Sequence, residues 1–380
     1  MSEASSPSVI DTSSPRWIDR PLRLSRALAR IGVAFAILGV LAELTARLYD
    51  ARAYGIPFNA TPDVNDDLVI RDSIGLRGRP NGKYLDRQLN SGGFRSPESA
   101  LTPMPGCVRV MVLGSSESFG YEEPNGEEYP AQLADSLGTR GCFQVMNAAI
   151  VGFSLPLMHQ LYERWGARFS PDIVVIMANP LPYIADEPPR APAPLLVESR
   201  EVRRQWRPRL LSKVRGLVNY PAFIQRRRIE RMVDQLVTGR PPEWFFREVP
   251  AKRLALFRSD VDSLVAKVLA QNATPMLLVH PIRFRSLSEA DAFTEMQAMR
   301  QFGGRALPEV LLQFDRAGGD AVRAIAALRG VPVVDLPPLM NGRHEFFADP
   351  VHYTPAGSAV VARTVAGAIS RWRNDSTVRR

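Results

Sequence analysis

The 380-residue chain carries 48 basic and 39 acidic residues, a formal net charge of +9, and 45% hydrophobic residues, as expected for one large globular domain with appendages. Two cysteines and four histidines offer few ligands for a zinc site, and a metal-centred mechanism is disfavoured. The positive charge suits nucleic acid, a membrane surface or an anionic polymer, so its distribution along the chain matters more than its sum.

The N-terminal region predicts a membrane anchor. Residues 1–30 form a basic tail, and an apolar run over 31–42 is extended by further apolar residues to about residue 49. This length approaches the roughly 20 residues that a bilayer requires. Five arginines precede the run and two follow it closely, which predicts a single-pass inner-membrane protein with a cytoplasmic N-terminus and a periplasmic or extracellular domain. A signal peptide cleaved after Ala42 is the alternative, and it would also export the domain.

The rest of the chain alternates predicted strands and helices. Residues 50–106 are rich in proline, glycine and asparagine and are expected to form an irregular lead-in. Five short apolar runs are typical of buried strands: 108–113, 143–147, 173–177, 276–279 and 331–335. Such alternation predicts an α/β fold over 107–375, with a five-stranded parallel sheet covered by helices on both faces. We expect this three-layered fold to be flavodoxin-like.

The long insertion at 181–250, between the third and fourth strands, carries most of the charge. Residues 186–231 hold twelve basic residues against five acidic ones. Apolar residues at helical spacing over 229–237 predict an amphipathic helix, which also carries the three arginines at 226–228. A solvated helix face explains the charge in the ordinary way, and a patch for anionic lipid or an acidic glycan is the alternative. We discount nucleic acid as a partner, because an exported domain would not meet it.

The first strand runs directly into a Gly-Ser-Ser turn that ends at Ser116, and a helix is predicted over 127–137. A serine in this position lies at the carboxyl edge of the sheet, where open α/β folds bind their ligands. Its hydroxyl can be exposed to a substrate while backbone N–H groups point toward it. A polar turn without chemistry explains this stretch equally well when it is considered alone.

Asp349 and His352 precede the last predicted helix, which begins at Thr354-Pro355 and runs to about Trp372. The three-residue spacing lets the carboxylate fold back onto one imidazole nitrogen, which would fix the tautomer and stabilise the imidazolium. A structural loop histidine is the ordinary explanation for such a pair. The other three histidines show no comparable acidic partner in the sequence.

Together, four motifs resemble the conserved blocks of the SGNH (GDSL-type) hydrolase superfamily, in its membrane-anchored, exported branch. The resemblance covers roughly residues 75–372, including the lead-in segment L-N-S-G-G-F-R. The motif G-S-S-E-S-F-G places Ser116 as the nucleophile, and D-P-V-H supplies Asp349 and His352. The motifs N-A-A-I-V-G and M-A-N-P place Gly152 and Asn179 in the oxyanion hole, together with the N–H of Ser116.

Ser115 and Pro180 each replace an aspartate that is common in the family. Neither change removes a catalytic group, but Pro180 lacks an N–H in the loop that aims Asn179. Because Ser115 is also a serine, the nucleophile could be assigned to either of two adjacent positions. The resemblance implies a serine-dependent acyl ester hydrolase without cofactor or metal, acting on acylated, such as acetylated, cell-envelope glycans. A polysaccharide O-acyltransferase and a non-catalytic glycan-binding module are the alternatives, and the intact set of five residues disfavours the second.

Cys107 and Cys142 directly precede the first two predicted strands and are expected to form a disulfide. In flavodoxin-like order these strands are parallel neighbours. Neighbouring strands lie about 4.8 Å apart, which is close to the Cα separation that a disulfide accepts. The bond would be structural, at the edge opposite the catalytic one, and it suits an exported domain. Two buried free cysteines are the alternative.

Overall fold

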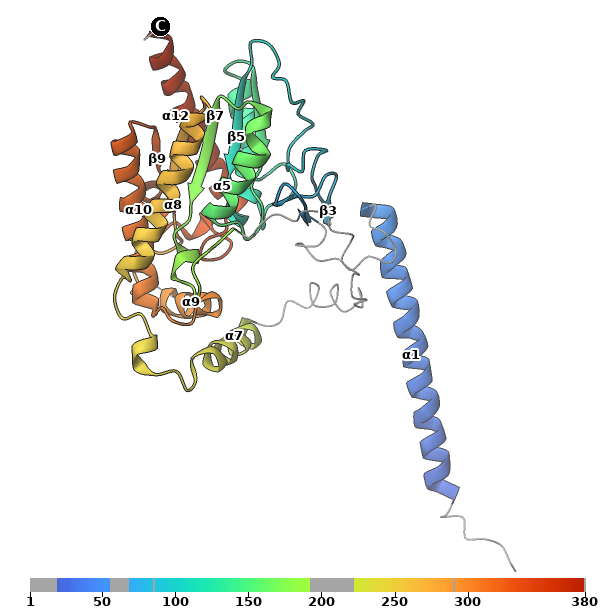
Figure 1. Cartoon of the computed structure of the whole chain (residues 1–380). Coiled ribbons are helices and arrows are strands. Elements are labelled where there is room, and N and C mark those ends of the chain that lie inside the picture. Colours follow the sequence, from blue (N-terminus) through green and yellow to red (C-terminus); the bar gives the residue numbers. More distant parts are fainter. Residues whose placement is uncertain (1–18, 55–67, 85, 192–221, 290, 379–380) are drawn as a thin grey trace, which may run out of the picture.

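The computed structural model describes the whole chain except residues 1–18, 55–67, 85, 192–221, 290 and 379–380 (Figure 1). Its centre is a five-stranded parallel sheet in the order β6-β5-β7-β8-β9. The strands are β5 (Val108–Leu113), β6 (Phe143–Asn147), β7 (Ile173–Ala178), β8 (Thr274–Val279) and β9 (Val333–Asp335). This order confirms the predicted flavodoxin-like sheet, and the five apolar runs match its strands to within two residues at each end.

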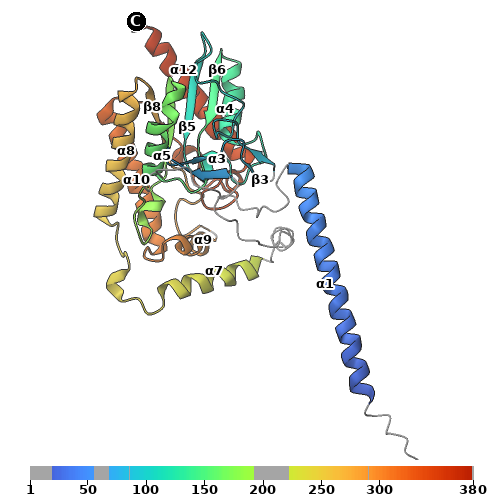
Figure 2. The ribbon, with the colours of Figure 1, turned by 45° about the vertical axis from the view of Figure 1, so that its right-hand side comes forward.

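Helices cover both faces of the sheet, as predicted (Figures 1 and 2). One layer contains α5 (Leu155–Arg164), α8 (Ala251–Ala270) and α10 (Pro308–Arg329), and the other contains α4 (Tyr129–Gly138) and α12 (Pro355–Val378). Strand side chains alternate between the two layers, so Met111 and Leu113 of β5 join the first core while Val110 and Val112 join the second. Because both faces of the central strands are buried, β7 is apolar throughout and β5 and β8 are nearly so.

The lead-in is irregular apart from two short antiparallel pairs, β1 (Val69–Arg71) with β2 (Leu76–Gly78) and β3 (Lys83–Tyr84) with β4 (Arg87–Gln88). It packs on the sheet domain through Arg95, which is 3% exposed. The Arg95 guanidinium donates hydrogen bonds to the carbonyl oxygens of residues 119 and 120, at 2.8 and 2.6 Å. The lead-in therefore braces the turn that follows β5.

The N-terminal helix α1 (Asp19–Tyr54) contains the predicted anchor. Its segment Leu28–Leu48 is 21 residues long and is apolar enough to cross a membrane, and none of its most apolar window is buried in the protein. Glu43, the acidic residue within this segment, pairs with Arg47 one helical turn later, with 2.7 Å between Nε and Oε1. Such pairing lowers the cost of placing either charge near a bilayer.

The insertion after β7 begins with η2 (Leu181–Ile184) and, after residues 192–221, continues with α7 (Ala222–Val237). The predicted amphipathic helix lies within α7, and its Val233 is buried. Most of the predicted basic patch falls in residues 192–221, outside the described residues. Further short helices are η1 (Gly166–Phe169), η3 (Pro242–Trp244), α9 (Ala292–Met299), η4 (Arg300–Phe302), α11 (Pro337–Met340) and η5 (His344–Phe346).

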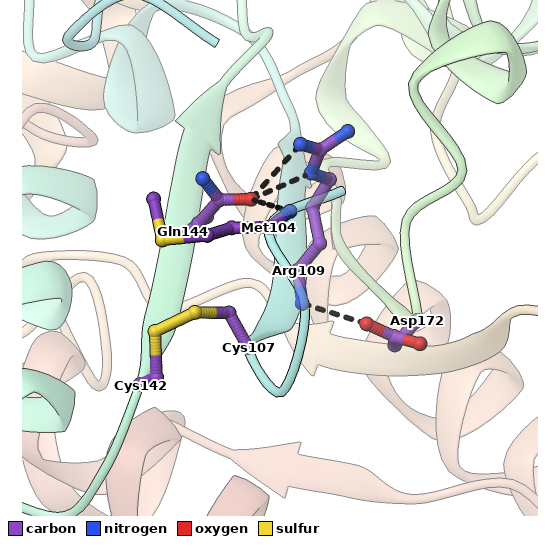
Figure 3. The surroundings of a disulfide bond; sticks show 6 residues. All are labelled: Met104, Cys107, Arg109, Cys142, Gln144 and Asp172. Carbon is purple, nitrogen blue, oxygen red and sulfur yellow. Dashed lines mark hydrogen bonds between the residues drawn. A yellow bond between two sulfur atoms is a disulfide. The ribbon is translucent and has the colours of Figure 1, made fainter. Parts of the chain in front are cut away.

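Cys107 and Cys142 are joined by a disulfide at the amino edge of the sheet, with their Cα atoms 4.5 Å apart (Figure 3). The buried Arg109 of β5 reinforces this edge, because its guanidinium donates to Oε1 of Gln144 on β6. The Arg109 backbone N–H also donates to Asp172, just before β7, at 2.7 Å. The disulfide and these bonds tie the starts of three neighbouring strands together, opposite the edge that carries the candidate site.

Candidate active site

Ser116 is the first residue of the one-turn helix α3 (Ser116–Phe119), which begins directly after β5. The turn is tight, because a Cβ added at Gly114 would lie 2.2 Å from the hydroxyl of Ser118. Ser116 Oγ lies 2.8 Å from His352 Nε2, whereas Ser115 is 6% exposed and packs inward. The structure therefore sets Ser116 rather than Ser115 against the histidine.

Asp349 and His352 lie on the loop before α12, as the sequence predicts. Asp349 Oδ1 accepts the backbone N–H groups of Val351 and His352 at 2.9 and 2.8 Å, which shapes the loop. The other carboxylate oxygen lies 2.5 Å from His352 Nδ1. With Nδ1 donating its proton to Asp349, Nε2 is left to accept the proton of Ser116.

The pair shifts both protonation equilibria. Burial alone would lower the pKa of His352, but the hydrogen bond and charge of Asp349, aided by Glu117 and Glu122, raise this pKa above its ordinary value of 6.5. Burial would raise the pKa of Asp349, but its hydrogen bonds with His352 and the nearby backbone hold it below its ordinary value of 3.8. The carboxylate thus stays ionised and would stabilise an imidazolium at His352.

Asn179 follows β7 and faces the same edge of the sheet. Its side-chain oxygen accepts the N–H of Leu181 at 2.9 Å, so its Nδ2 points the other way. The proline at position 180 does not disturb this arrangement, because the bond uses the N–H of the residue after it. The structure therefore retains an aimed amide despite the departure from the family motif.

Gly152 lies in the exposed turn after β6 with φ +79°, a conformation that favours glycine. Its loop packs against the turn of Ser116, because the N–H of Ile150 donates to the carbonyl of Gly114 at 3.3 Å. Ser116 begins α3, and the first N–H groups of a helix have no partner within it. Three polar groups that could face an oxyanion thus come from three neighbouring strand ends.

The sequence reasoning missed a second histidine–carboxylate pair behind the first. His280, which directly follows β8, is 2% exposed, and its Nδ1 lies 2.7 Å from Oδ1 of the buried Asp315 on α10. Its Nε2 lies 3.9 Å from Oε1 of Glu117, which is 1% exposed. The expectation that the other histidines lack a comparable partner is wrong for His280. The signal available in the sequence was its position at the end of a strand.

Glu117 connects the candidate site to His280. Its Oε1 accepts a hydrogen bond from Nδ2 of Asn179 at 2.9 Å, and its Oε2 lies 3.4 Å from Ser116 Oγ. The residue that follows the candidate nucleophile therefore has a buried carboxyl group between the Asn179 amide and His280. Sequence pattern alone gave no reason to single it out, since an acid in the first turn of a helix is common.

Glu122, Asp349 and His352 are the only described residues that group as potential metal ligands, with donor atoms within 4.8 Å of one another. Asp349 and His352 already bind each other, and Glu122 is exposed. We therefore assign no metal to this group. A separate cavity of about 460 Å³ lies between the lead-in and α4, and no residue of the predicted site lines it.

No protein-family model matches the sequence, and no curated protein matches it. Solved structures that align with it include a lipolytic protein of the G-D-S-L family from Desulfitobacterium hafniense, at 10% identity over 69% of this chain and 99% of that one, with a TM-score of 0.39. A lipase/acylhydrolase from Enterococcus faecalis aligns at 13% identity over 69% and 95%, with a TM-score of 0.42. An acetyl-xylooligosaccharide esterase from Geobacillus aligns at 15% identity over 69% and 94%, with a TM-score of 0.41. We rest the functional proposal on the geometry of the site.

Proposed function

We propose that the chain is an SGNH-type serine ester hydrolase. The observation that carries this proposal is the continuous chain of contacts from Ser116 Oγ to His352 Nε2, at 2.8 Å, and from His352 Nδ1 to Asp349 Oδ2, at 2.5 Å. A hydroxyl, an imidazole and a carboxylate in this order form an activated nucleophile, its base and the group that orients the base.

In the proposed reaction Ser116 Oγ attacks the ester carbonyl carbon, and His352 Nε2 takes the hydroxyl proton. His352 then gives this proton to the departing alcohol as the carbon–oxygen bond breaks, which leaves an acyl-enzyme. Water, deprotonated by the same imidazole, attacks the acyl carbonyl, releases the carboxylic acid and restores the Ser116 hydroxyl. No cofactor is needed for these steps.

The negative charge on the carbonyl oxygen would be held by the backbone N–H groups of Ser116 and Gly152 and by the side-chain amide of Asn179. Donors that are in place before the reaction stabilise this charge without reorganisation, and losing one typically costs about 10²–10³ in turnover. The fixed orientation of the Asn179 amide supports this role.

For the substrate we propose acylated, such as acetylated, glycans of the cell envelope, reached from the outer side of the cytoplasmic membrane. The apolar segment of α1 and the disulfide between Cys107 and Cys142 support an anchored, exported domain, because cytosolic proteins rarely keep disulfides. A contact of α7, the arginine-bearing helix of the basic insertion, with anionic lipid or an acidic glycan is part of this proposal.

Hydrolysis of p-nitrophenyl acetate by the detergent-solubilised full chain tests the proposal. We expect nitrophenol release that is lost, by about 10³-fold or more, in both Ser116→Ala and His352→Ala. Assays with and without acetylated and free oligosaccharides then separate transfer to water from transfer to a sugar hydroxyl. Hydrolysis that survives Ser116→Ala would contradict the proposed mechanism.

A further inference from the structure

The Asn179 side chain is held at both ends. Its Oδ1 accepts the N–H of Leu181 at 2.9 Å, and its Nδ2 donates one hydrogen to Glu117 Oε1 at 2.9 Å. A side-chain amide is planar and carries two hydrogens on its nitrogen. Fixing the oxygen and one hydrogen therefore also fixes the direction of the second hydrogen, which remains for an oxyanion.

Glu117 is well suited to hold the amide but is costly to bury. Its side chain is 1% exposed, and an uncompensated carboxylate in the interior is strongly destabilising. Its contact with Ser116 Oγ, at 3.4 Å, is long, so the nucleophile gives little compensation. A negative charge so close to a developing oxyanion would also oppose the reaction unless another group balances it.

His280 supplies that balance. The ring is 2% exposed, and Asp315 on α10 fixes it through Nδ1 at 2.7 Å. Among the described residues its Nε2 has no hydrogen-bond partner, and this atom faces Glu117 Oε1 at 3.9 Å. Burial alone would lower the pKa of His280, but Asp315 and then Glu117 outweigh it and raise this pKa, against a smaller opposing effect of His352.

We propose that Glu117, His280 and Asp315 form a buried positioning relay that aims the Asn179 amide at the oxyanion. Asp315 orients the imidazole, the imidazole faces and balances the Glu117 carboxylate, and the carboxylate fixes the amide. All three are positioning residues, since they act through Asn179. The inference rests on the proposed function, in which Asn179 is an oxyanion donor.

Two substitutions at Glu117 separate positioning from packing. Glu117→Gln keeps an oxygen that can accept from Asn179, whereas Glu117→Met keeps the volume and removes the acceptor. We expect Glu117→Met to lower kcat by about 10²-fold with KM within about twofold, and Glu117→Gln to lower kcat by at most about 10-fold. Glu123→Gln, a change at another fully buried carboxyl group, is the control and is expected to leave kcat within about twofold.

A double-mutant cycle tests the route through Asn179. If Glu117 acts by aiming the amide, Glu117→Met should add less than about threefold to the loss in kcat of Asn179→Ala. A second readout does not depend on turnover, because the chain has only four histidines and ¹⁵N-histidine spectra can resolve them. Glu117→Gln should lower the titration midpoint of His280, and Glu123→Gln should leave it in place.

The outcomes are distinct. Equal kcat losses in the Gln and Met variants, multiplying effects of Glu117→Met and Asn179→Ala, or an unmoved His280 midpoint in Glu117→Gln would each overturn the relay while the enzyme itself remains active. A wild-type protein that neither hydrolyses p-nitrophenyl acetate nor reacts with a fluorophosphonate would overturn the proposed function, and the relay with it.

Discussion

His352 carries the proton that ester hydrolysis would move, and its surroundings set the pH at which it can accept one. Only the neutral imidazole can act as a base toward Ser116. Asp349 holds the pKa of His352 above 6.5, so as the pH falls most of the neutral form is already protonated when the pH reaches 6.5. The same carboxylate that stabilises the imidazolium in the reaction therefore limits activity at acidic pH.

The pH dependence of kcat/KM follows from this. We expect an acid limb with a midpoint above 6.5, because protonation of His352 in the free enzyme abolishes the base. Asp349→Asn should move this midpoint to lower pH, since the raising effect is removed, and should lower the plateau by up to about 10⁴-fold. Rates measured from pH 5 to 9 check both effects, and an unmoved midpoint would show that Asp349 does not act on His352.

Helix α10 serves the site from two positions one turn apart. Asp315 holds His280, and Gly318 lies so close to Pro180 that an added Cβ would sit 2.5 Å from the proline Cβ. This close approach keeps the loop that carries Asn179 against the helix. The packing of α10 thus fixes both His280 and the loop that carries Asn179.

Gly318→Ala should push the Pro180 loop outward. We expect overpacking to lower the free energy of unfolding by about 1–3 kcal/mol. We also expect kcat to fall by more than the loss of folded protein at the assay temperature explains. Gly367→Ala on α12 is the control, because an added Cβ there meets only an arginine nitrogen at 3.5 Å. It should keep kcat and gain up to about 1 kcal/mol from helix propensity. A stopped assay measures kcat and denaturant unfolding measures stability in both variants. Equal kcat values in Gly318→Ala and Gly367→Ala would exclude this role of α10.

The strands and the pair of Asp349 and His352 could be predicted because their signals are local. The strand order, and the contact between Ser116 and His352 across 236 residues, were expected only from the resemblance to a known family. Each strand is an apolar run, Ser116 follows one directly, and Asp349 lies three residues from His352. The pair of His280 and Asp315 could not be predicted, because 35 residues separate them and their contact depends on how α10 is rotated against β8. Glu117 gave no signal either, since only the packed structure shows that its carboxyl group is buried.

For the molecule as a whole, the disulfide makes the stability of the fold depend on the redox state of its compartment. It joins residues 35 apart in sequence and ties β5 to β6 away from the site. Closing a loop of this length contributes about 3–4 kcal/mol in the chain-entropy model. An oxidising compartment would preserve this contribution, and α1 contains a segment that is long and apolar enough to cross a membrane.

Replacing both cysteines by serine should lower the free energy of unfolding by about 3–4 kcal/mol and leave the kcat of the folded enzyme within about twofold, because the bond lies at the opposite edge of the sheet. Denaturant unfolding and ester hydrolysis measure the two effects. Protein taken from the periplasm and denatured without a reductant should show no titratable thiols. Two free thiols would count against both the bond and the export of the domain.

Ser116 is the proposed nucleophile, and covalent trapping can identify the reacting residue itself. A fluorophosphonate probe, followed by proteolysis and mass spectrometry, should place one phosphonyl group on Ser116 in the wild type and in Ser115→Ala, and none on Ser116→Ala. Labelling that persists in Ser116→Ala, or that disappears in Ser115→Ala while Ser116 is intact, would contradict the account.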